Sequence, residues 1–126
     1  MLYRFSHKTG AYAVTIEEER DDDVLVKVVQ VIKHPKQGDL HNPTETEGVF
    51  FHTRKALSQY EKRFTPRSRL KPFEGDTMPY VASLQHAISQ LEDKLRTKND
   101  AHAQQSLHCL AQLKEDYRLQ YKENFV

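Results

Sequence analysis

The chain has 126 residues, of which 29% are charged and 37% are hydrophobic, and its formal net charge is +1. This length is enough for one ordinary domain or two small packed units. So small a net charge excludes a strong overall field that would steer the protein to nucleic acid or lipid.

The first part of the chain carries strand patterns. Apolar residues alternate over 11–17 and predict a strand there. The acidic run 17–23 predicts a solvated hairpin tip. The β-branched run 24–32 predicts a strand that is buried on much of both faces and is ended by Pro35, which cannot donate to a ladder.

Further short strands are predicted between the histidine-rich region and the acidic break at 74–77. Residues 48–51 predict one strand. Residues 56–63 fit either a helix or a strand, and a strand is favoured because prolines follow closely. Residues 65–70 predict one turn of 3₁₀ helix before a short last strand. Five short strands separated by turns predict a small barrel.

Two helices are predicted after this break. Asp76 or Thr77 can cap the first, and Pro79 suits its first turn. Asn99 is a candidate left-handed C-cap, and Asp100 is a candidate N-cap for the second helix.

Apolar residues recur along both helices at helical spacing, so each helix carries one apolar stripe. So short a link predicts an antiparallel hairpin that docks on the barrel. The predicted units are a barrel over 1–75 and a helical hairpin over 76–126. The apolar positions are Leu84, Ile88, Leu91 and Leu95 in the first helix and Ala103, Leu107, Leu110, Leu113, Tyr117 and Tyr121 in the second.

Between the predicted strands, the segment from His34 to Arg54 holds three histidines, His34, His41 and His52, with Asp39 nearby. A zinc site needs three or four converging ligands, and this segment lacks the compact pairs of ligands that usually supply them. Packing within the loop is therefore the favoured interpretation of the histidines, and no metal or other cofactor is expected.

Catalytic signals are absent from the sequence. Cys109 follows His108, but neighbouring residues on a helix point in different directions and do not form a nucleophile–base pair. The chain has no glycine-rich phosphate loop and no nucleophile-elbow motif. We therefore expect a protein that is not an enzyme and has no small-molecule substrate.

A basic stretch offers an alternative function. Seven Lys or Arg residues and a single acid, Glu61, lie between 54 and 71, with Tyr60 and Phe64 interleaved. Small barrels bind oligonucleotides through such faces, although a merely solvated barrel face is also consistent with the pattern. The residues that would bind nucleic acid are Arg54, Lys55, Lys62, Arg63, Arg67 and Arg69.

The residue types in the loop from His34 to Gly48 predict a defined backbone shape. Pro35 and Pro43 bias the residues before them to extended geometry, and Gly38 with Asp39 can form a tight turn. Loops this long in compact domains are usually functional or disordered, and the turn chemistry favours order. Either a partner recognises this loop or the loop only crosses the end of the barrel.

Four segments resemble the kinase-associated protein B family of sporulating bacilli. They are TGAYAVTIEE, VIKHPKQGDLHNP, VFFHTRKAL and LKPFEGD, and a Pro-Tyr-led helix follows them. The resemblance implies a mainly β plus α fold, in which a small SH3-like β-barrel is followed by an antiparallel two-helix hairpin. It also implies a role in activating a membrane sensor histidine kinase that feeds the sporulation phosphorelay. It implies no catalytic residues.

The sequence therefore predicts a non-enzymatic accessory protein that acts by protein–protein interaction with a sensor histidine kinase or an associated signalling protein. Nucleic-acid binding by a basic-faced barrel is the alternative. The predicted partner-binding residues are His34, Gly38, Asp39, Leu40, His41, Asn42, Pro43, Phe50, Phe51, His52 and Arg54.

The location predicted from the sequence is cytoplasmic, with any membrane contact made only through the kinase. Members of the resembling family are often called lipoproteins, and lipidation needs an apolar N-terminal segment that ends in a cysteine. The chain begins MLYRFSHKTG and its one cysteine is Cys109. On these grounds we expect no lipoprotein signal and a reducing compartment.

Overall fold

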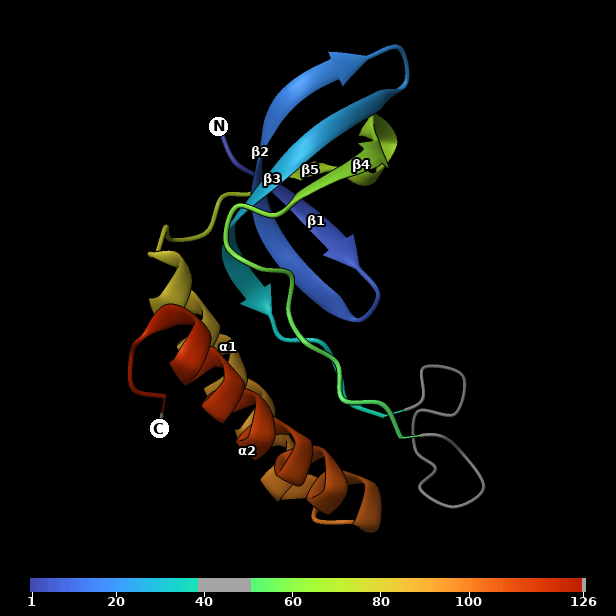
Figure 1. Ribbon diagram of the computed structural model, residues 1–126. Coiled ribbons are helices and arrows are strands. Elements are labelled where there is room, and N and C mark those ends of the chain that lie inside the picture. Colours follow the sequence, from blue (N-terminus) through green and yellow to red (C-terminus); the bar gives the residue numbers. More distant parts are fainter. Residues whose placement is uncertain (39–50, 126) are drawn as a thin grey trace.

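A computed structural model describes residues 1–38 and 51–125 (Figure 1). The strands are β1 (Tyr3–His7), β2 (Gly10–Arg20), β3 (Asp23–Lys33), β4 (Lys62–Pro66) and β5 (Lys71–Pro72). Within these residues they form one antiparallel sheet in the order β4-β3-β2-β1-β5.

The helices are α1 (Tyr80–Lys98) and α2 (Ala101–Tyr121), and a 3₁₀ turn, η1 (Arg67–Arg69), joins β4 to β5 as predicted. The two long helices run side by side beneath the sheet, and α1 packs against β3 (Figure 1). The predicted fold class of mainly β plus α is therefore confirmed.

The hairpin of β2 and β3 is the centre of the sheet. Val24, Val26 and Val28 are fully buried on one face, while the residues between them are only half-buried. The prediction that β3 is buried on much of both faces is thus too strong, because its second face is only partly covered. Three register shifts between β2 and β3 bend these strands, as β-bulges do. The acidic tip of the hairpin is exposed, as predicted.

One strand prediction was wrong over most of its length, another lies mostly outside the described residues, and one strand was missed. The missed strand is β1, which pairs with both β2 and β5. For the predicted strand at 48–51, residues 48–50 lie outside the described residues, and Phe51 belongs to no strand. The strand predicted over 56–63 begins only at Lys62.

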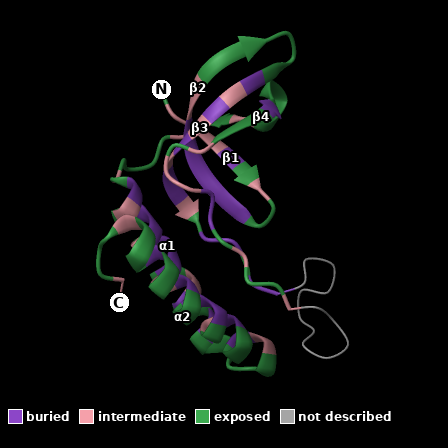
Figure 2. Ribbon diagram, in the orientation of Figure 1, coloured by how far each residue is buried: buried purple, intermediate pink, exposed green. Residues whose placement is uncertain are grey.

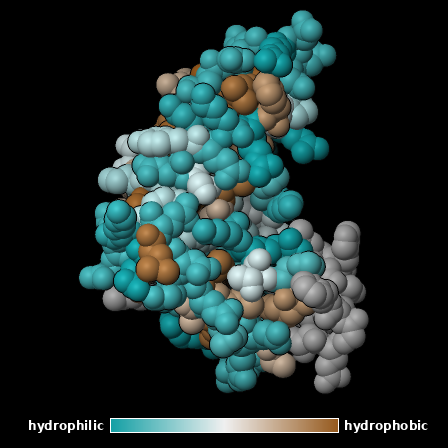
Figure 3. Space-filling model, in the orientation of Figure 1, coloured by the Kyte–Doolittle hydropathy of each residue, from teal (hydrophilic) through white to brown (hydrophobic). Residues whose placement is uncertain are grey.

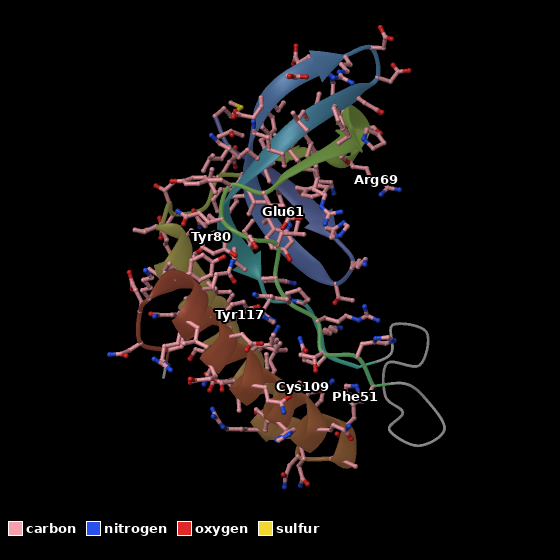
Figure 4. All side chains as sticks on the ribbon, in the orientation of Figure 1. Phe51, Glu61, Arg69, Tyr80, Cys109 and Tyr117 are labelled. Atoms are coloured by element: carbon pink, nitrogen blue, oxygen red, sulfur yellow. The ribbon has the colours of Figure 1, made fainter. Side chains whose placement is uncertain are left out.

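Tyrosine hydroxyls explain why residues 56–59 form no strand. Residues 56–58 belong to no regular element and Gln59 lies in a turn, and four tyrosines bind backbone groups of this segment in place of a neighbouring strand. Figure 4 labels two of them, Tyr80 and Tyr117. The bonds join Tyr117 Oη to Ala56 N at 2.9 Å, Tyr12 Oη to Leu57 N at 3.1 Å, Tyr121 Oη to Gln59 N at 3.3 Å and Tyr80 Oη to Leu57 O.

The start of α1 differs from the prediction. Pro79 occupies the N-cap position and no side chain caps the helix, so neither Asp76 nor Thr77 has the predicted role. The buried side chain of Gln30 binds the backbone just before the helix, because it donates to the carbonyl of Asp76 and accepts from the N–H of Met78, each at 3.0 Å. The segment before α1 is therefore fastened to β3.

The link between the helices is as predicted. Asn99 has the left-handed conformation, with φ of 49°, and ends α1. Asp100 caps α2, because its Oδ1 accepts from the N–H of Ala103 at 2.7 Å. Farther along the hairpin, Lys114 pairs with the buried carboxylate of Glu92 and joins the helices.

Most of the predicted apolar stripes form the core between the helices and the sheet (Figure 2). Of the ten predicted positions, Leu91, Leu107 and Tyr121 are only partly buried. The seven that are buried are Leu84, Ile88, Leu95, Ala103, Leu110, Leu113 and Tyr117.

Removing the N-cap of α2 should weaken the fold. Asp100→Ala is expected to lower the free energy of unfolding by about 1 kcal/mol, because the N–H of Ala103 loses its side-chain acceptor. Asp100→Asn keeps an acceptor oxygen and is the matched control, with an expected loss below about 0.5 kcal/mol. Urea unfolding followed by circular dichroism measures both, and equal losses in the two variants would contradict the cap.

Candidate partner-binding surface at the loop stem

Residues 34–38 and 51–54, here called the loop stem, are the described parts of the predicted recognition loop. They run side by side away from the sheet (Figure 1), and contacts with His102, Cys109 and Tyr117 hold them to α2. Gly38 N–H donates to the carbonyl of His52 at 2.8 Å, and Arg54 Nε donates to the carbonyl of Gly38 at 3.2 Å. Both halves of the stem are thus held to each other.

The side chain of Gln37 joins the two halves of the stem by hydrogen bonds. This side chain is buried, and its Oε1 accepts from the backbone N–H of Arg54 at 2.7 Å. Its Nε2 donates to the carbonyls of Arg54 at 2.9 Å and Pro35 at 3.0 Å. The amide side chain pairs with both backbone groups of Arg54 as a neighbouring strand would.

His34 joins the stem to α2. Its Nδ1 lies 2.9 Å from the carbonyl of Pro35, and its Nε2 lies 2.9 Å from the hydroxyl of Tyr117. Because a carbonyl only accepts, the proton sits on Nδ1, and Nε2 accepts from the Tyr117 hydroxyl. The same hydroxyl accepts from the N–H of Ala56.

Burial dominates the electrostatics of His34. It lowers the pKa of the imidazole to about 4, and the hydrogen bond to Pro35 opposes this only in part. His34 is therefore neutral at physiological pH and supports the stem from within. A ring with both nitrogens occupied and 3% of its surface exposed cannot offer its side chain to a partner or a metal.

The stem also needs a glycine at position 38. Gly38 has φ of +103°, and a Cβ there would lie 3.0 Å from the Phe51 ring and 3.1 Å from Nε2 of His102. Phe51 packs on His102 with ring centroids 5.2 Å apart and is half-buried. Phe51 therefore anchors the stem to α2 and exposes only part of its ring.

Next to the stem lies a recess of about 250 Å³, here called the basic groove. It is formed by the turn between β1 and β2, by the stem and by β4. Tyr12, Pro35 and Leu57 contribute apolar surface. Its polar lining consists of His7, Lys8, His52, Thr53, Arg54, Lys55 and Arg63.

The positive charge in the groove contributes to the lowered pKa of His7. Partial burial is the largest cause that lowers this pKa, and Arg63 and Lys8 lower it further by repelling the proton. Glu61, which pairs with Arg63 at 2.8 Å, opposes them. The groove therefore has a positive potential in the absence of any ligand.

The structure places only some of the predicted site residues. His52 and Arg54 line the basic groove, while His34, Gly38 and Phe51 support the stem. Sequence reasoning missed His7 and Lys8, which no local pattern connects to a loop some thirty residues away. The remaining predicted partner-binding residues, Asp39, Leu40, His41, Asn42, Pro43 and Phe50, lie outside the described residues.

The residues predicted for nucleic-acid binding do not share one surface. Arg54, Lys55 and Arg63 line the basic groove, but Arg67 pairs with Glu19 on the acidic hairpin at 2.9 Å. The interleaved aromatic rings contact cations of the same chain. Lys27 Nζ lies 5.4 Å from the centre of the Tyr60 ring, and Arg20 Cζ lies 4.7 Å from the centre of the Phe64 ring.

Cys109 and the histidines show no catalytic arrangement in the described part of the chain. Cys109 is buried in α2, and its Sγ accepts from the hydroxyl of Thr53 at 3.4 Å. Among residues 1–38 and 51–125, no group of three or more His, Cys, Asp or Glu side chains is placed to hold a metal ion. The visible face of the molecule is mostly hydrophilic, with scattered hydrophobic groups (Figure 3).

Comparison with known proteins identifies relatives over most of the chain. The family described as KapB, kinase associated protein B, matches residues 7–118. Kinase-associated lipoprotein B of Bacillus subtilis (strain 168) is 40% identical over 111 residues, which cover 88% of this chain and 87% of that protein. The crystal structure of kinase-associated protein B from Bacillus cereus superposes with a TM-score of 0.74 at 28% identity, covering 93% of this chain and 94% of the other.

The name of the Bacillus subtilis relative corrects the predicted location. A protein 40% identical to this chain is called a lipoprotein, which contradicts the prediction of a cytoplasmic protein without a lipoprotein signal. That prediction rested only on the residues around Met1 and on the position of Cys109, and neither is a sufficient basis. Neither α1 nor α2, the long helices in the described residues, combines the length and apolar character needed to cross a membrane.

Proposed function

The chain belongs to the kinase-associated protein B family, and from this premise we propose that it is a non-enzymatic accessory protein of a sensor histidine kinase. It acts by protein–protein interaction and contributes to activation of the sporulation phosphorelay. The loop between His34 and Arg54 is its recognition surface, with the loop stem as the support and the basic groove beside it.

The network of hydrogen bonds that holds the loop stem is the observation that carries this proposal. Side-chain and backbone hydrogen bonds hold Gln37, Gly38 and Arg54 in one arrangement, and His34 and Phe51 fasten that arrangement to α2. A surface already held in its bound shape loses less conformational entropy on binding. Such a stem therefore favours the interpretation that a partner recognises the loop over the interpretation that the loop only connects two strands.

The absence of a catalytic role is supported by how the reactive groups of the described residues are used. The ring nitrogens of His34 are both occupied, and Cys109 is buried behind Thr53. The polar side chains of the basic groove are mostly cationic and include neither a carboxylate nor a cysteine. Binding of an acidic surface is the chemistry that such a lining supports.

A retention assay with the cytoplasmic part of a sensor histidine kinase tests the proposal. Asp39→Ala combined with Leu40→Ala is expected to weaken retention on the order of tenfold or more, because a few central residues usually carry most of the binding energy. The matched control is Asp93→Ala with Leu119→Ala, which removes an exposed acid and an exposed leucine on the helices. This control is expected to bind like the wild type.

Two results would contradict the proposal in different ways. Equal retention of both double variants would remove the loop as the recognition surface. No retention of the wild-type protein by any sensor histidine kinase of the organism would remove the kinase as the partner.

A further inference from the structure

We propose that the basic groove is a binding site for a dianionic oxyanion of the phosphate monoester class. This inference goes beyond the proposed function, because it concerns what the groove itself binds and holds whether or not the partner is a kinase. It rests on charge, on the arrangement of donors and on the size of the recess.

The positive charge of the groove favours a ligand that carries more than one negative charge. Lys8, Arg54, Lys55 and Arg63 converge there from three separate segments of the chain. One carboxylate, that of Glu61, pairs with Arg63. Four cations less one carboxylate leave a charge of +3 within about 250 Å³, and a dianion balances more of this charge than a single carboxylate does.

The donors are held in place before any ligand arrives. Arg54 donates from Nε to the carbonyl of Gly38, which fixes the plane of its guanidinium group. No hydrogen bond or ion pair within the described residues uses its two terminal nitrogens, and a planar pair of N–H donors matches two oxygens of a phosphoryl group. Lys55 also lines the groove, and its Nζ lies 5.6 Å from the centre of the Tyr117 ring.

The charge around the groove also acts on His7. Burial is the largest cause of the lowered pKa of His7, and Arg63 and Lys8 lower this pKa further because they disfavour the protonated imidazole. A bound dianion would reverse this effect and raise the pKa of His7. The titration of His7 therefore reports occupancy of the groove.

The size of the recess favours a single phosphoryl group over a nucleic-acid strand. A strand needs a basic track that continues past one recess, and beyond Arg63 the next arginine along the chain, Arg67, is paired with Glu19. A second recess of about 350 Å³ lies on the other side of the stem, with Lys36, Lys94 and Lys98 in its lining. It also contains Asp100 and the apolar side chains of Leu91 and Leu95, so it is a poorer site for a dianion.

Nuclear magnetic resonance with the whole chain tests the inference, with inorganic phosphate as the probe and acetate at the same ionic strength as the comparison. Phosphate is expected to shift the amides of Lys8, Arg54 and Lys55 saturably and to raise the pKa of His7. Acetate is expected to do neither. Equal effects of the two anions would overturn the proposal.

Three matched double variants locate the site. Lys8→Gln with Lys55→Gln is expected to weaken phosphate binding on the order of tenfold or more, because each removes a charge-assisted donor. Lys62→Gln with Lys71→Gln removes the same charge from exposed strand positions and is expected to leave binding unchanged. Loss of binding on Lys94→Gln with Lys98→Gln instead would place the anion in the second recess and overturn the assignment.

Two further probes identify the source of the phosphate. A phosphorylated peptide that binds at least about tenfold more tightly than inorganic phosphate would identify a protein side chain as the natural ligand, and equal affinity would identify free phosphate. A single-stranded oligonucleotide whose binding is unaffected by loss of Lys8 and Lys55, together with no saturable binding of phosphate, would overturn the proposal in favour of nucleic acid.

Discussion

Tyr117→Phe is expected to lower the free energy of unfolding by about 3 kcal/mol. The substitution removes one hydroxyl that donates to Nε2 of His34 and accepts from the N–H of Ala56. All three residues are buried, so water cannot replace the lost partner. Leaving a buried donor or acceptor unsatisfied costs about 1–3 kcal/mol, and here one of each is left.

Two other tyrosines make this a matched series. Tyr60→Phe removes a hydroxyl from a side chain that is 60% exposed and is expected to change stability by less than about 0.5 kcal/mol. Tyr121→Phe should lie between the two, because its hydroxyl accepts from the N–H of Gln59, which is only partly buried. Urea unfolding of the three variants measures the order. A loss for Tyr117→Phe no larger than that for Tyr60→Phe would contradict the role of the buried hydroxyl.

The protein is expected to lose about 3 kcal/mol of stability as the pH falls from about 6.5 to about 4. Burial lowers the pKa of His34 from 6.5 in the unfolded chain to about 4 in the folded protein. Between these values the unfolded chain binds a proton that the folded protein does not, so acid favours unfolding. The contribution of neutral His34 is complete above about 6.5 and is lost as the pH approaches 4, at about 1.4 kcal/mol per pKa unit.

His34→Gln separates this titration from the others. The variant is expected to be less stable at neutral pH but to show a much flatter dependence of stability on pH between about 4 and 6.5. His7, whose pKa is also lowered, acts in the same direction and leaves a smaller slope. Hydrogen bonds from Lys27 and Arg118 lower the pKa values of the Glu17 and Glu115 carboxylates, which also favours unfolding in acid, but this contribution is common to both proteins. Urea unfolding at several pH values measures the slopes, and parallel curves for the two proteins would contradict the assignment to His34.

Local patterns located most of the regular elements. The alternation around Val14 and the valine-rich run of β3 predicted the central hairpin, because side chains alternate across a strand with a period of two. Asn99 and Asp100 predicted the link between the helices, because left-handed backbone and N-capping are properties of single residues and their immediate neighbours.

The same local reasoning failed where partners come from distant parts of the chain. Residues 56–59 have a pattern that suits a strand, yet their backbone groups bond to hydroxyls of tyrosines such as Tyr12 and Tyr117. Asp76 was a reasonable cap for α1, yet Pro79 takes the N-cap position and Gln30 in β3 holds the backbone just before the helix. The spacing of residue types within one segment does not predict hydrogen bonds that join residues more than forty positions apart.

For the candidate site, too, local patterns predicted some features and only the tertiary structure decided others. By itself the sequence determined the fold class and the family, because these depend on residue types and on spacing along the chain. Only the tertiary structure decided that His34 is a neutral, buried support and that the turn at Lys8 meets Arg54 and Arg63 in one basic groove. Burial and the convergence of like charges are properties of packed surfaces, and packing brings these residues together from segments that the sequence keeps apart.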